Sequence, residues 1–559
     1  MKPLDLVVVG GGIVGLAVAR LAARNRLSVA VLERGDLACG TSSQSSHMLH
    51  GGLRYLEYGQ FALVRESLAE RAAVARMAPA LARPCRFLVP LYRGGRVAPW
   101  KLRAGLGLYD WLAGPRSLAR HGFVGAREAR ALEPALAPEG LRGAGLYSDV
   151  VMNDAALAVA VARDAAAHGA QIHTRIEVVG AKPLDDGAIE IAARDLGSGT
   201  VLEFPARVVV NATGPWCDET RRRLLAGLRP GDPDVAPLLR PSRGSHLVYP
   251  ALTQRHALLL TARSDGRVIF VVPFGGHSLV GTTEIETPSP PPAEAFRPSL
   301  EELRYLRREL AKALPPVAEY RPIAAFAGVR PLLRAEEAVG RASREHRVIE
   351  EHGLVTIAGG KYTTFRTMAQ DVLAHVARRK LRREPIRDSD DPLPAPIAAG
   401  AAVELVARHA VEHEFARALE DVMRRRTLQW LEPDRGRIVA RFMAANMGKE
   451  LGWSAARTSE EIERCWTRRA TCAGAATPSC RSTSRAPAGS STTAMRSGRA
   501  CWAPCARPGA PPTAGSPRSG SPTSARPRCC GSARAASPLR ARSCGRTGAP
   551  ASAAPRSSA

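Results

Sequence analysis

The first 33 residues of the chain alternate between apolar runs and a glycine-rich turn. The run LDLVVVG is followed by GGIVG, then by the apolar stretch LAVARLAARN and by a second run, LSVAVLE. A short apolar run bounded by glycine is typical of a buried strand, and a longer apolar stretch is typical of a helix. The order strand, glycine turn, helix, strand predicts one βαβ unit, the opening of a doubly wound α/β domain.

Hydrophobic spacing predicts two further helices and a meander. Residues 53–82 carry apolar side chains at helical spacing, with Pro84 as a stop signal, and residues 155–168 show the same pattern and end at Gly169. From Gln171 to Glu203, short apolar runs alternate with turn residues. This alternation predicts a small antiparallel meander that leads into the buried strand of ARVVVNATGPW.

Two later regions, residues 240–285 and 320–358, carry the strand-like runs SHLVYP, ALLLTA, RVIFVVPF, HSLVGTTE and GLVTIAG. We expect these runs to form a second sheet on the substrate side of a cleft. The Pro-, Asp- and Gly-rich segment 388–400 is typical of a linker. The pattern therefore predicts a region over residues 1–390, in which a dinucleotide-binding domain and a β-rich domain are interleaved, and a helical domain over residues 391–465.

Composition changes after the helical domain. Residues 466–559 are mainly Ala, Arg, Ser, Pro, Gly and Cys without apolar periodicity, so we predict disorder there, because too little apolar surface can be buried to offset ordering. After Glu463 the chain has sixteen Arg and no Asp, Glu or Lys. Our interpretation is a GC-rich gene read out of frame; the alternative is a basic arm that binds nucleic acid or anionic lipid.

Length, charge and cysteine content limit the class of protein. A chain of 559 residues that is 45% hydrophobic can form two or three domains, and of its formal charge of +27 only +11 belongs to residues 1–463. Cys39, Cys85 and Cys217 offer no disulfide framework in that region. The strand-like run close to Met1 leaves no room for a secretion signal, and no apolar stretch approaches the roughly 20 residues of a membrane span. We expect a protein that is not secreted and whose membrane contact is at most peripheral.

Three glycines in the first turn form the pattern Gly10-x-Gly12-x-x-Gly15 between a strand and a helix, and Glu33 ends the next strand. This context is typical of a dinucleotide-binding fingerprint. The glycine backbone can approach a pyrophosphate at the helix N-terminus, and Glu33 can accept hydrogen bonds from the adenosine ribose. The fingerprint alone does not separate NAD from FAD.

The next segment, TSSQSSHMLHGGLRYL over residues 41–56, resembles the signature of the FAD-dependent glycerol-3-phosphate dehydrogenases. In that family a Thr-Ser-Ser stretch and a Leu-Ile-His-Gly-Gly-Leu-Arg-Tyr-Leu string lie beside the flavin. The family usually has Lys or Arg before the string, where this chain has His47. Further similar motifs follow in family order: RGSH (243–246), GTT (281–283), GVRPL (328–332), GGK (359–361), TTFR (363–366), RRRT (424–427) and LGWS (451–454).

The resemblance covers roughly residues 3–465 and implies an α/β fold, in which an FAD-binding, Rossmann-like doubly wound domain is interleaved with a β-rich substrate domain and followed by a small C-terminal helical domain. It implies non-covalent FAD, oxidation of sn-glycerol 3-phosphate to dihydroxyacetone phosphate, and electron transfer to a membrane quinone. We expect no metal, a cytoplasmic location peripheral to the inner face of the membrane, and a homodimer as one possible state. The implied cofactor-binding residues are Gly10, Gly12, Gly15, Glu33, Thr41, Ser42, Ser46, Gly51, Gly52, Ala212, Gly214, Gly360, Lys361 and Thr363.

The types of residue in these motifs suit the same chemistry. Arg54, Arg330 and Lys361 are candidate cations for a phosphate, and Tyr55 can add a hydroxyl donor. His50 and His246 are candidate catalytic bases, because imidazole can take the proton of the C2 hydroxyl as hydride leaves C2 for the flavin. Arg330 is a third candidate catalytic residue. The sequence does not decide between the two histidines. Residues 359–364 are expected to open a helix that ends near Val376 and whose N-terminus stabilises the reduced flavin.

Three alternative functions remain, and a misfolded or inactive product caused by the irregular tail is a further alternative. A glycerol-3-phosphate oxidase would share the first half-reaction and return electrons to oxygen. An amine or 2-hydroxy-acid oxidase of the same superfamily is disfavoured by the Arg54-Tyr55 pair and by residues 359–366. A basic nucleic-acid-binding protein acting through the tail would show strongly salt-dependent DNA binding, and we do not expect a nucleic-acid partner.

Overall fold

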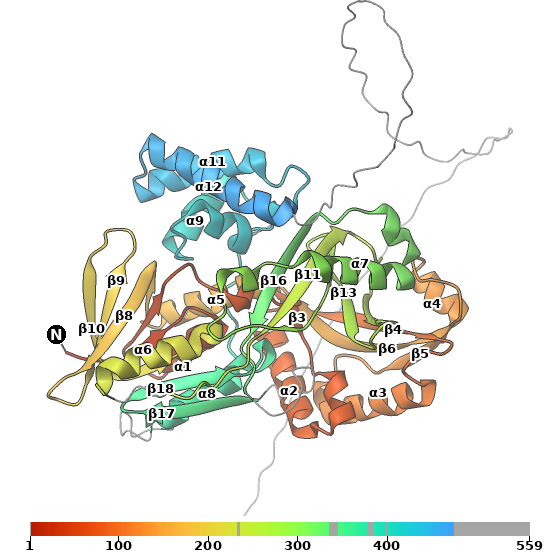
Figure 1. Ribbon diagram of the computed structural model, residues 1–559, viewed down its shortest axis with the longest axis horizontal. Helices are drawn as coiled ribbons and strands as arrows, with labels where there is room; N and C mark the ends of the chain where they lie inside the picture. The colour runs from red at the N-terminus through yellow and green to blue at the C-terminus, as the bar shows by residue number, and fades with distance from the viewer. Residues whose placement is uncertain (1, 232–234, 335–344, 378–384, 399, 475–559) are drawn as a thin grey trace, which may run out of the picture. The chain divides into compact units, whose positions relative to one another are not determined.

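The computed structural model describes residues 2–231, 235–334, 345–377, 385–398 and 400–474, with side chains described as far as residue 465 (Figure 1). These residues form two β-sheets flanked by helices and a group of C-terminal helices. The predicted disorder of the tail falls, from residue 475 onward, outside the described residues.

The first sheet has, within the described residues, eight strands, and its central strands are parallel. Strand β1 pairs with β2 on one side and with β10 on the other, and the order along the sheet is β17-β18-β10-β1-β2-β7. Strand β9 pairs antiparallel with β10, and β8 pairs antiparallel with β9, which forms the predicted meander. The strands are β1 (Leu4–Val9), β2 (Val29–Glu33), β7 (Gln171–Thr174), β8 (Ile176–Pro183), β9 (Ile189–Asp195), β10 (Val201–Asn211), β17 (His346–Glu351) and β18 (Leu354–Gly359).

Strand β1 is apolar throughout its second half because both of its faces are covered. Leu6 and Val8 pack towards the helices α1 (Ile13–Arg24), α5 (Asp154–Ala167) and α8 (Phe365–Val376). Val7 and Val9 pack on the opposite side with α6 (Cys217–Leu228) and the meander. A continuous apolar run is the pattern expected of a parallel strand that is buried on both faces. The predicted βαβ opening and doubly wound domain are confirmed.

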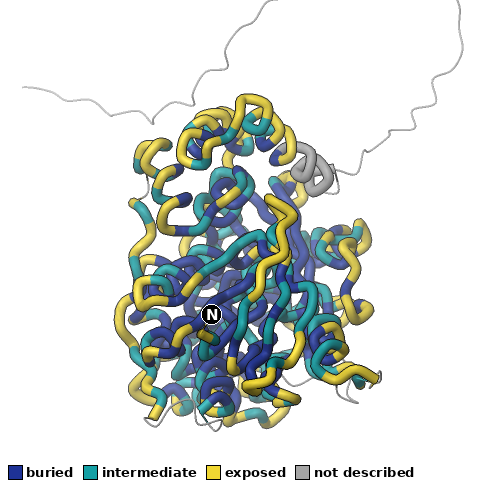
Figure 2. Tube along the Cα trace, turned by 90° about the vertical axis from the view of Figure 1, so that its left-hand side faces the viewer, coloured by how far each residue is buried: buried dark blue, intermediate teal, exposed yellow. Residues whose placement is uncertain are grey.

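The second sheet is mostly antiparallel and has, in the described part of the chain, ten strands. Helices α2 (Phe61–Met77) and α3 (Pro99–Ala113) share an apolar core with one of its faces, and α7 (Leu300–Ala313) shares another core with it. Figure 2 shows the buried residues gathered between such layers and the exposed ones outside. The strands are β3 (Met48–Leu49), β4 (Ala82–Tyr92), β5 (Gly122–Gly125), β6 (Leu141–Met152), β11 (Ser242–Pro250), β12 (Ala257–Thr261), β13 (Val268–Phe274), β14 (His277–Gly281), β15 (Ile285–Glu286) and β16 (Ala324–Arg330).

Two strand assignments from the sequence were wrong. The run GLVTIAG was expected in the second sheet, but it forms β18, which pairs parallel to β10 in the first sheet. The run at Gln171 was expected to open the antiparallel meander, but β7 pairs parallel to β2. In both cases the partner strand lies far away in the sequence, and apolar content alone does not show which sheet a strand joins.

The prediction of a single helix over residues 53–82 was also wrong in detail, because two separate helices lie in this stretch. A 3-10 helix, η2 (Leu53–Tyr58), ends at Gly59, whose φ of +70° breaks the helical path before α2 begins. Pro84, expected as a stop signal, lies inside β4 opposite Val150. The helix predicted over residues 155–168 corresponds to α5, and the helix predicted to end near Val376 corresponds to α8.

The C-terminal helices are α9 (Val403–Glu412), α10 (Leu419–Asp421), the π-helical turn η9 (Val422–Arg426), α11 (Arg437–Leu451) and α12 (Ala455–Gly474). They share their own apolar core, as predicted for a helical region after residue 401. Helix α12 runs nine residues past the point where disorder was predicted to start. Because no Gly or Pro occurs between Trp466 and Cys472, and Arg and Ala favour helices, the backbone can continue the helix that precedes them.

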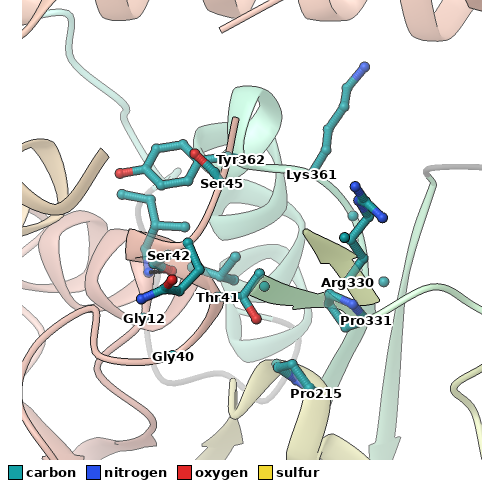
Figure 3. A pocket seen from close by; sticks show the side chains of 18 of the residues that line it. Gly12, Gly40, Thr41, Ser42, Ser45, Pro215, Arg330, Pro331, Lys361 and Tyr362 are labelled. Atoms are coloured by element: carbon teal, nitrogen blue, oxygen red, sulfur yellow. Dashed lines mark hydrogen bonds between the residues drawn. The ribbon is translucent and has the colours of Figure 1, made fainter. Parts of the chain in front are cut away.

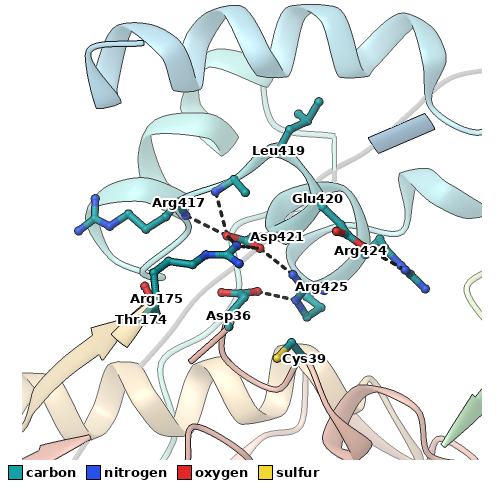
Figure 4. A network of polar contacts seen from close by, with 12 residues as sticks. Asp36, Cys39, Thr174, Arg175, Arg417, Leu419, Glu420, Asp421, Arg424 and Arg425 are labelled. Atoms are coloured by element: carbon teal, nitrogen blue, oxygen red, sulfur yellow. Dashed lines mark hydrogen bonds and ion pairs between the residues drawn. The ribbon is translucent and has the colours of Figure 1, made fainter. Parts of the chain in front are cut away.

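Buried ion pairs join these helices to the first sheet. Arg425 and Arg426 of η9 both donate to the carboxylate of Asp36, which follows β2. Arg425 also donates to Asp421, which in turn accepts from Arg175 (Figure 4). Burial alone would raise the pKa of Asp36, but the charges of Arg426 and Arg425 outweigh burial and lower it.

The segment predicted as a linker holds no helix or strand among its described residues, and ion pairs attach it to the first domain. Asp388 lies 3.7 Å from Arg20 and accepts from Arg366, and Asp391 accepts from Arg24. Leu393 N donates to the carbonyl of Met77 at the end of α2. The segment therefore follows a defined course along helices α1, α2 and α8.

We expect Asp36→Asn to destabilise the attachment of the C-terminal helices, because it leaves the buried guanidinium of Arg426 without its carboxylate and leaves Arg425 with Asp421 alone. Breaking a buried pair costs roughly 3–5 kcal/mol. The same exchange at the exposed Asp185 should change stability by less than about 0.5 kcal/mol. Denaturant unfolding and limited proteolysis after residue 398 would measure both. Equal stability of the two variants would show that the ion pairs do not hold the helices in place.

Candidate active site

A cavity of about 990 Å³ is lined by residues of both sheets. Its volume suits a large organic ligand. Nearly all of the residues singled out from the sequence lie in its wall: Gly10, Gly12, Glu33, Thr41, Ser42, Ser46, His50, Gly52, Arg54, Tyr55, Ala212, Gly214, His246, Arg330, Gly360, Lys361 and Thr363.

Two predicted residues lie behind the wall instead of in it. A Cβ atom on Gly15 would stand 2.0 Å from the carbonyl oxygen of Gly10, so only glycine lets α1 start this close to β1. Gly51 is buried, and its N–H donates to the hydroxyl of Tyr109 at 2.9 Å. Both glycines therefore shape the cavity by backbone packing.

One end of the cavity is built for an anion. The first turn of α1 contains no acidic residue, and the residue before the helix, Gly12, offers no side chain to cap it. The Ile13 N–H donates to Ser42 Oγ at 3.0 Å. Because the N-terminus of a helix carries partial positive charge and free N–H groups, this end favours a phosphate. Figure 3 shows Gly12, Thr41 and Ser42 together on one side of the cavity.

Glu33 holds the loop that surrounds this anion site. Its carboxylate accepts from the N–H groups of Gly11 and Gly35, each at 2.6 Å. Burial raises the pKa of Glu33, against the effect of these two hydrogen bonds. A carboxylate at the end of β2 is the group expected to accept from a ribose hydroxyl.

The segment from Thr41 to His50 crosses from the first sheet to the second. Thr41 Oγ1 donates to the carbonyl of Val329 in β16 at 2.6 Å, and Ser45 Oγ donates to Asp154 at the start of α5, also at 2.6 Å. Ser46 Oγ lies 2.9 Å from His246 Nε2 in β11. The hydroxyl groups that made this segment conspicuous therefore tie both sheets to one cavity wall.

His47 is buried and does not line the cavity. It stands at the position where the resembled family has a cation. Its ring stacks on Phe274 at 4.0 Å, and its Nδ1 lies 3.2 Å from Asp154 Oδ1. Burial lowers the pKa of His47 in spite of that carboxylate. A neutral, packed imidazole therefore stands where a cationic contact was in question.

The opposite end of the cavity gathers cationic side chains, and Figure 3 shows Arg330 and Lys361 next to each other there. Arg330, at the end of β16, donates to Thr282 Oγ1 at 2.8 Å and to the carbonyl of Thr283 at 3.3 Å. Lys361 Nζ lies 5.1 Å from the centre of the Tyr55 ring. Arg54 of η2 also lines the cavity and lies over the ring of Tyr58. Such a group suits a phosphate, because guanidinium and ammonium groups bind it by charge-assisted hydrogen bonds.

His246 lies beside this cationic end and is 2% exposed. Its ring stacks on Phe326 with centroids 4.9 Å apart. Burial lowers the pKa of His246 well below its ordinary value, and the charge of Arg330 lowers it further. The imidazole is therefore neutral and able to accept a proton at physiological pH. His50 lies in the same wall, 6.4 Å from the ring of Tyr55.

The motifs RGSH and GTT leave space for the side chains of His246 and Arg330 and support the strands that carry them. A Cβ on Gly244 would lie 2.2 Å from Arg330 Nη2, and one on Gly281 would lie 2.3 Å from His246 Cδ2. The buried carboxylate of Glu302 pairs with Arg243 and accepts from Ser245 and Thr283: the distances are 2.8, 2.8 and 2.6 Å. The glycines leave room, and Glu302 fixes the strands that carry the site.

Three residues that shape the site were missed from the sequence: Asp154, Glu302 and Phe296. Asp154 organises the crossing segment, and Tyr362 donates to its carbonyl at 2.6 Å. Trp216 lines the cavity and stacks on Phe296, with centroids 4.9 Å apart. Glu302, Asp154 and Phe296 lie in no motif, and their partners are distant in the sequence. The position of Asp154 at the start of a predicted helix was the one local signal.

The chain matches the model of a protein family described as FAD dependent oxidoreductase over residues 5–366. Residues 367–458 match a model described as the C-terminal domain of alpha-glycerophosphate oxidase. A solved structure, the glycerol-3-phosphate dehydrogenase of Bacillus halodurans complexed with FAD, superposes with a TM-score of 0.65 at 22% identity and covers 84% of this chain and 95% of that one. Together, the fold and the cavity define an FAD-dependent oxidoreductase, and FAD is its cofactor.

Two curated relatives narrow this class. A glycerol-3-phosphate dehydrogenase of Mycobacterium leprae (strain TN) is 34% identical over 525 residues, which cover 83% of this chain and 87% of the relative. Glycerol-3-phosphate dehydrogenase 2 of Mycobacterium tuberculosis (strain ATCC 25618 / H37Rv) is 39% identical over 381 residues, and the match covers 66% of this chain and 63% of that relative. The chain belongs to the family of the FAD-dependent glycerol-3-phosphate dehydrogenases.

The residues present fit the cofactor. The uncapped start of α1 offers N–H groups to the pyrophosphate, and Glu33 lies where the adenosine ribose would bind. Ser46, Gly52 and Gly360 line the stretch of cavity towards the cationic end, where the ring system would lie.

We expect Gly15→Ala to abolish FAD binding, because its Cβ would meet the carbonyl of Gly10 and push α1 away from β1. The matched control is Gly180→Ala, whose Cβ would meet no atom within 4 Å. Flavin absorbance per protein, measured after reconstitution with excess FAD, should be near zero in the first variant and unchanged in the second. Full flavin content in Gly15→Ala would refute the role given to this contact.

Proposed function

We propose that the chain oxidises sn-glycerol 3-phosphate to dihydroxyacetone phosphate and that the electrons pass by way of FAD to a membrane quinone. The proposal rests on one observation about the cavity. At one end, the cationic side chains of Arg330 and Lys361 lie together with the buried, neutral imidazole of His246. A phosphorylated alcohol needs both, since its phosphate requires cations and its hydroxyl requires a base.

Arg330 is the proposed principal phosphate ligand. Thr282 and Thr283 accept hydrogen bonds from its guanidinium and so fix the plane of the group before substrate binds. A fixed guanidinium loses little freedom on binding and can hold two phosphate oxygens at once. Lys361 and Arg54 would add charge from the other side, and the Tyr55 hydroxyl would add a donor.

His246 is the proposed base for the proton of the C2 hydroxyl. Its neutral state leaves it ready to accept a proton, and Ser46 and Phe326 hold its ring in place. Arg330 lowers its pKa in the empty site, and a phosphate dianion bound to Arg330 would offset that effect. His50 lines the same cavity, 6.4 Å from the ring of Tyr55, and we assign it to binding or positioning of the substrate.

FAD supplies the hydride acceptor when it is bound. The chain orients it by the proposed contacts at Gly10, Gly12 and Glu33, and the start of η7 (Tyr362–Thr364) would lie beside its ring system. Loss of the C2 hydride and of the hydroxyl proton converts the alcohol to a ketone, which balances the oxidation. The proton stays on His246 until it returns to solvent.

A membrane quinone as the electron acceptor requires that the protein reach the membrane, so its location is part of the same proposal. Among the described helices none is long and apolar enough to cross a bilayer. We propose a cytoplasmic protein that is bound peripherally to the inner face of the membrane, and a domain boundary near residue 390. An oxidase would instead release peroxide in amounts equal to the substrate oxidised, and this product distinguishes it.

Arg330→Gln should lower kcat/KM for glycerol 3-phosphate by roughly 10- to 100-fold, the effect expected for losing a charge-assisted hydrogen bond to phosphate. Arg330→Lys keeps the charge and should recover part of the loss. Arg255→Gln, which removes an exposed arginine that does not line the cavity, is the control. Steady-state kinetics with a soluble dye acceptor would measure all three. An unchanged KM in Arg330→Gln would remove Arg330 from phosphate binding.

The pH dependence of kcat/KM should identify the base. Because the folded-state pKa of His246 lies well below its ordinary value, the imidazole stays neutral as the pH falls from 8 towards about 6.5, the ordinary value for histidine. We therefore expect kcat/KM, corrected for titration of the substrate phosphate, to stay level over that range and to fall only below it. An acidic limb centred at or above that ordinary value would point to a histidine with an unshifted pKa and against His246.

A further inference from the structure

Helix α3 presents an apolar face to solvent. Trp100 and Trp111 are 73% and 74% exposed, which makes them the most exposed large hydrophobic side chains among the described residues. They stand eleven residues apart, three turns of a helix, with Ala104 and Leu108 between them on the same side. We call these four residues the tryptophan face.

The opposite side of α3 packs into the protein core, so the tryptophan face is not needed to hold the helix in place. Leu102, Leu106 and Tyr109 are buried in the core under the second sheet. The tryptophan face therefore contributes nothing to that core, and its exposure costs free energy in water. Paired indole rings on a helix surface are typical of a contact with a partner or a membrane interface.

Basic side chains border the tryptophan face. Lys101 and Arg103 lie on either side of it around the helix. Residues 93–121 contain six Lys or Arg side chains and one acidic residue, Asp110, which pairs with His121 at 2.7 Å. The surface is thus apolar in the middle and mainly positive around it, with Glu57 of the neighbouring η2 offsetting part of the charge of Arg96 and Lys101.

This face lies next to the cavity that holds the cationic site. Glu57 of η2 lies 3.3 Å from Arg96 and 3.7 Å from Lys101. The same short helix supplies cavity-lining residues, and one of them, Tyr58, is itself 36% exposed. Figure 1 shows α3 beside α2, below the strands β4, β5 and β6 of the second sheet.

We propose that the tryptophan face docks on an anionic lipid bilayer. Indole rings favour the level of the headgroups, and each basic side chain is attracted to anionic lipid. A second copy of the chain is a poorer partner, because a two-fold contact through this face would bring two sets of basic side chains together. One consequence of this docking rests on the proposed function: a lipid-soluble quinone would enter beside the cavity. The docking itself does not depend on that function.

The test compares three full-length, FAD-loaded proteins on vesicles of phosphatidylcholine with and without phosphatidylglycerol. They are the unaltered chain, the double variant Trp100→Ser/Trp111→Ser and the control Ile438→Ser/Phe442→Ser, which removes a similarly exposed apolar pair from α11 (67% and 58% exposed). The arginines after Glu463 add the same charge to all three, and raised salt weakens their contribution.

We expect the tryptophan variant to need at least about tenfold more anionic lipid for half-maximal binding. The control should bind as the unaltered chain does, and all three should bind neutral vesicles weakly. Equal binding by the tryptophan variant, an equal loss in the control, or equal binding to neutral vesicles would overturn the proposal. So would a tryptophan variant that changes from dimer to monomer while its lipid binding stays the same, because the face would then join two copies.

Activity readouts keep this proposal separate from the proposed function. With glycerol 3-phosphate and a soluble dye, the tryptophan variant should retain its rate, which shows that it is folded and carries flavin. With a quinone embedded in anionic vesicles, its rate should fall with its lipid binding. If the unaltered chain does not oxidise glycerol 3-phosphate, the proposed function fails, and the vesicle titration still decides the docking surface.

Discussion

The contact between Gly15 and the carbonyl of Gly10 determines where the rest of the site can lie. It lets α1 begin directly against the end of β1, so that a buried helix points its uncapped N-terminus into the cavity. Ten of the twelve residues of α1 are buried, so the helix cannot shift without disturbing the main core. The anion-binding end of the cavity is therefore as rigid as the core itself.

From that point the chain builds the second half of the site by crossing to the other sheet. The hydroxyl groups of Thr41, Ser45 and Ser46 each contact a different element: β16, α5 and β11. One short segment thereby joins the cofactor end of the cavity to His246 and Arg330. The distance between the two ends is then a property of the packed sheets, which is what hydride transfer between a bound cofactor and a bound substrate requires.

Local patterns in the sequence predicted the parts of the site that short-range chemistry governs. Gly10, Gly12 and Glu33 lie in the cavity wall, because a turn, a helix start and a strand end are encoded within about thirty residues. The hydroxyl-rich segment also lies there, and it was the family resemblance that assigned this segment to the flavin. The motif residues Arg330, His246 and Lys361 also lie together there. The family resemblance, and not the spacing of these three residues, predicted that they belong to one site.

Long-range pairing was where prediction from the sequence failed. The run GLVTIAG joins the first sheet because β10, about 145 residues earlier, offers it a parallel edge, and an apolar run does not specify its partner. The salt bridges from Asp36 to Arg425 and Arg426 span about 390 residues, and single charged residues carry no sign of such a partner. The supporting roles of Glu302 and Asp154 were missed for the same reason.

The most direct test of the central claim is a single anaerobic titration. Purified full-length protein loaded with FAD is mixed, without oxygen, with glycerol 3-phosphate, with glycerol or with a 2-hydroxy acid, and the absorbance of the oxidised flavin is followed. The account predicts stoichiometric bleaching by glycerol 3-phosphate alone, because the cationic end of the cavity selects the phosphate and His246 takes the proton. Bleaching by the 2-hydroxy acid, or by glycerol as readily as by glycerol 3-phosphate, would show that glycerol 3-phosphate is not the specific substrate. The assignment of the fold as an FAD-binding one would still stand.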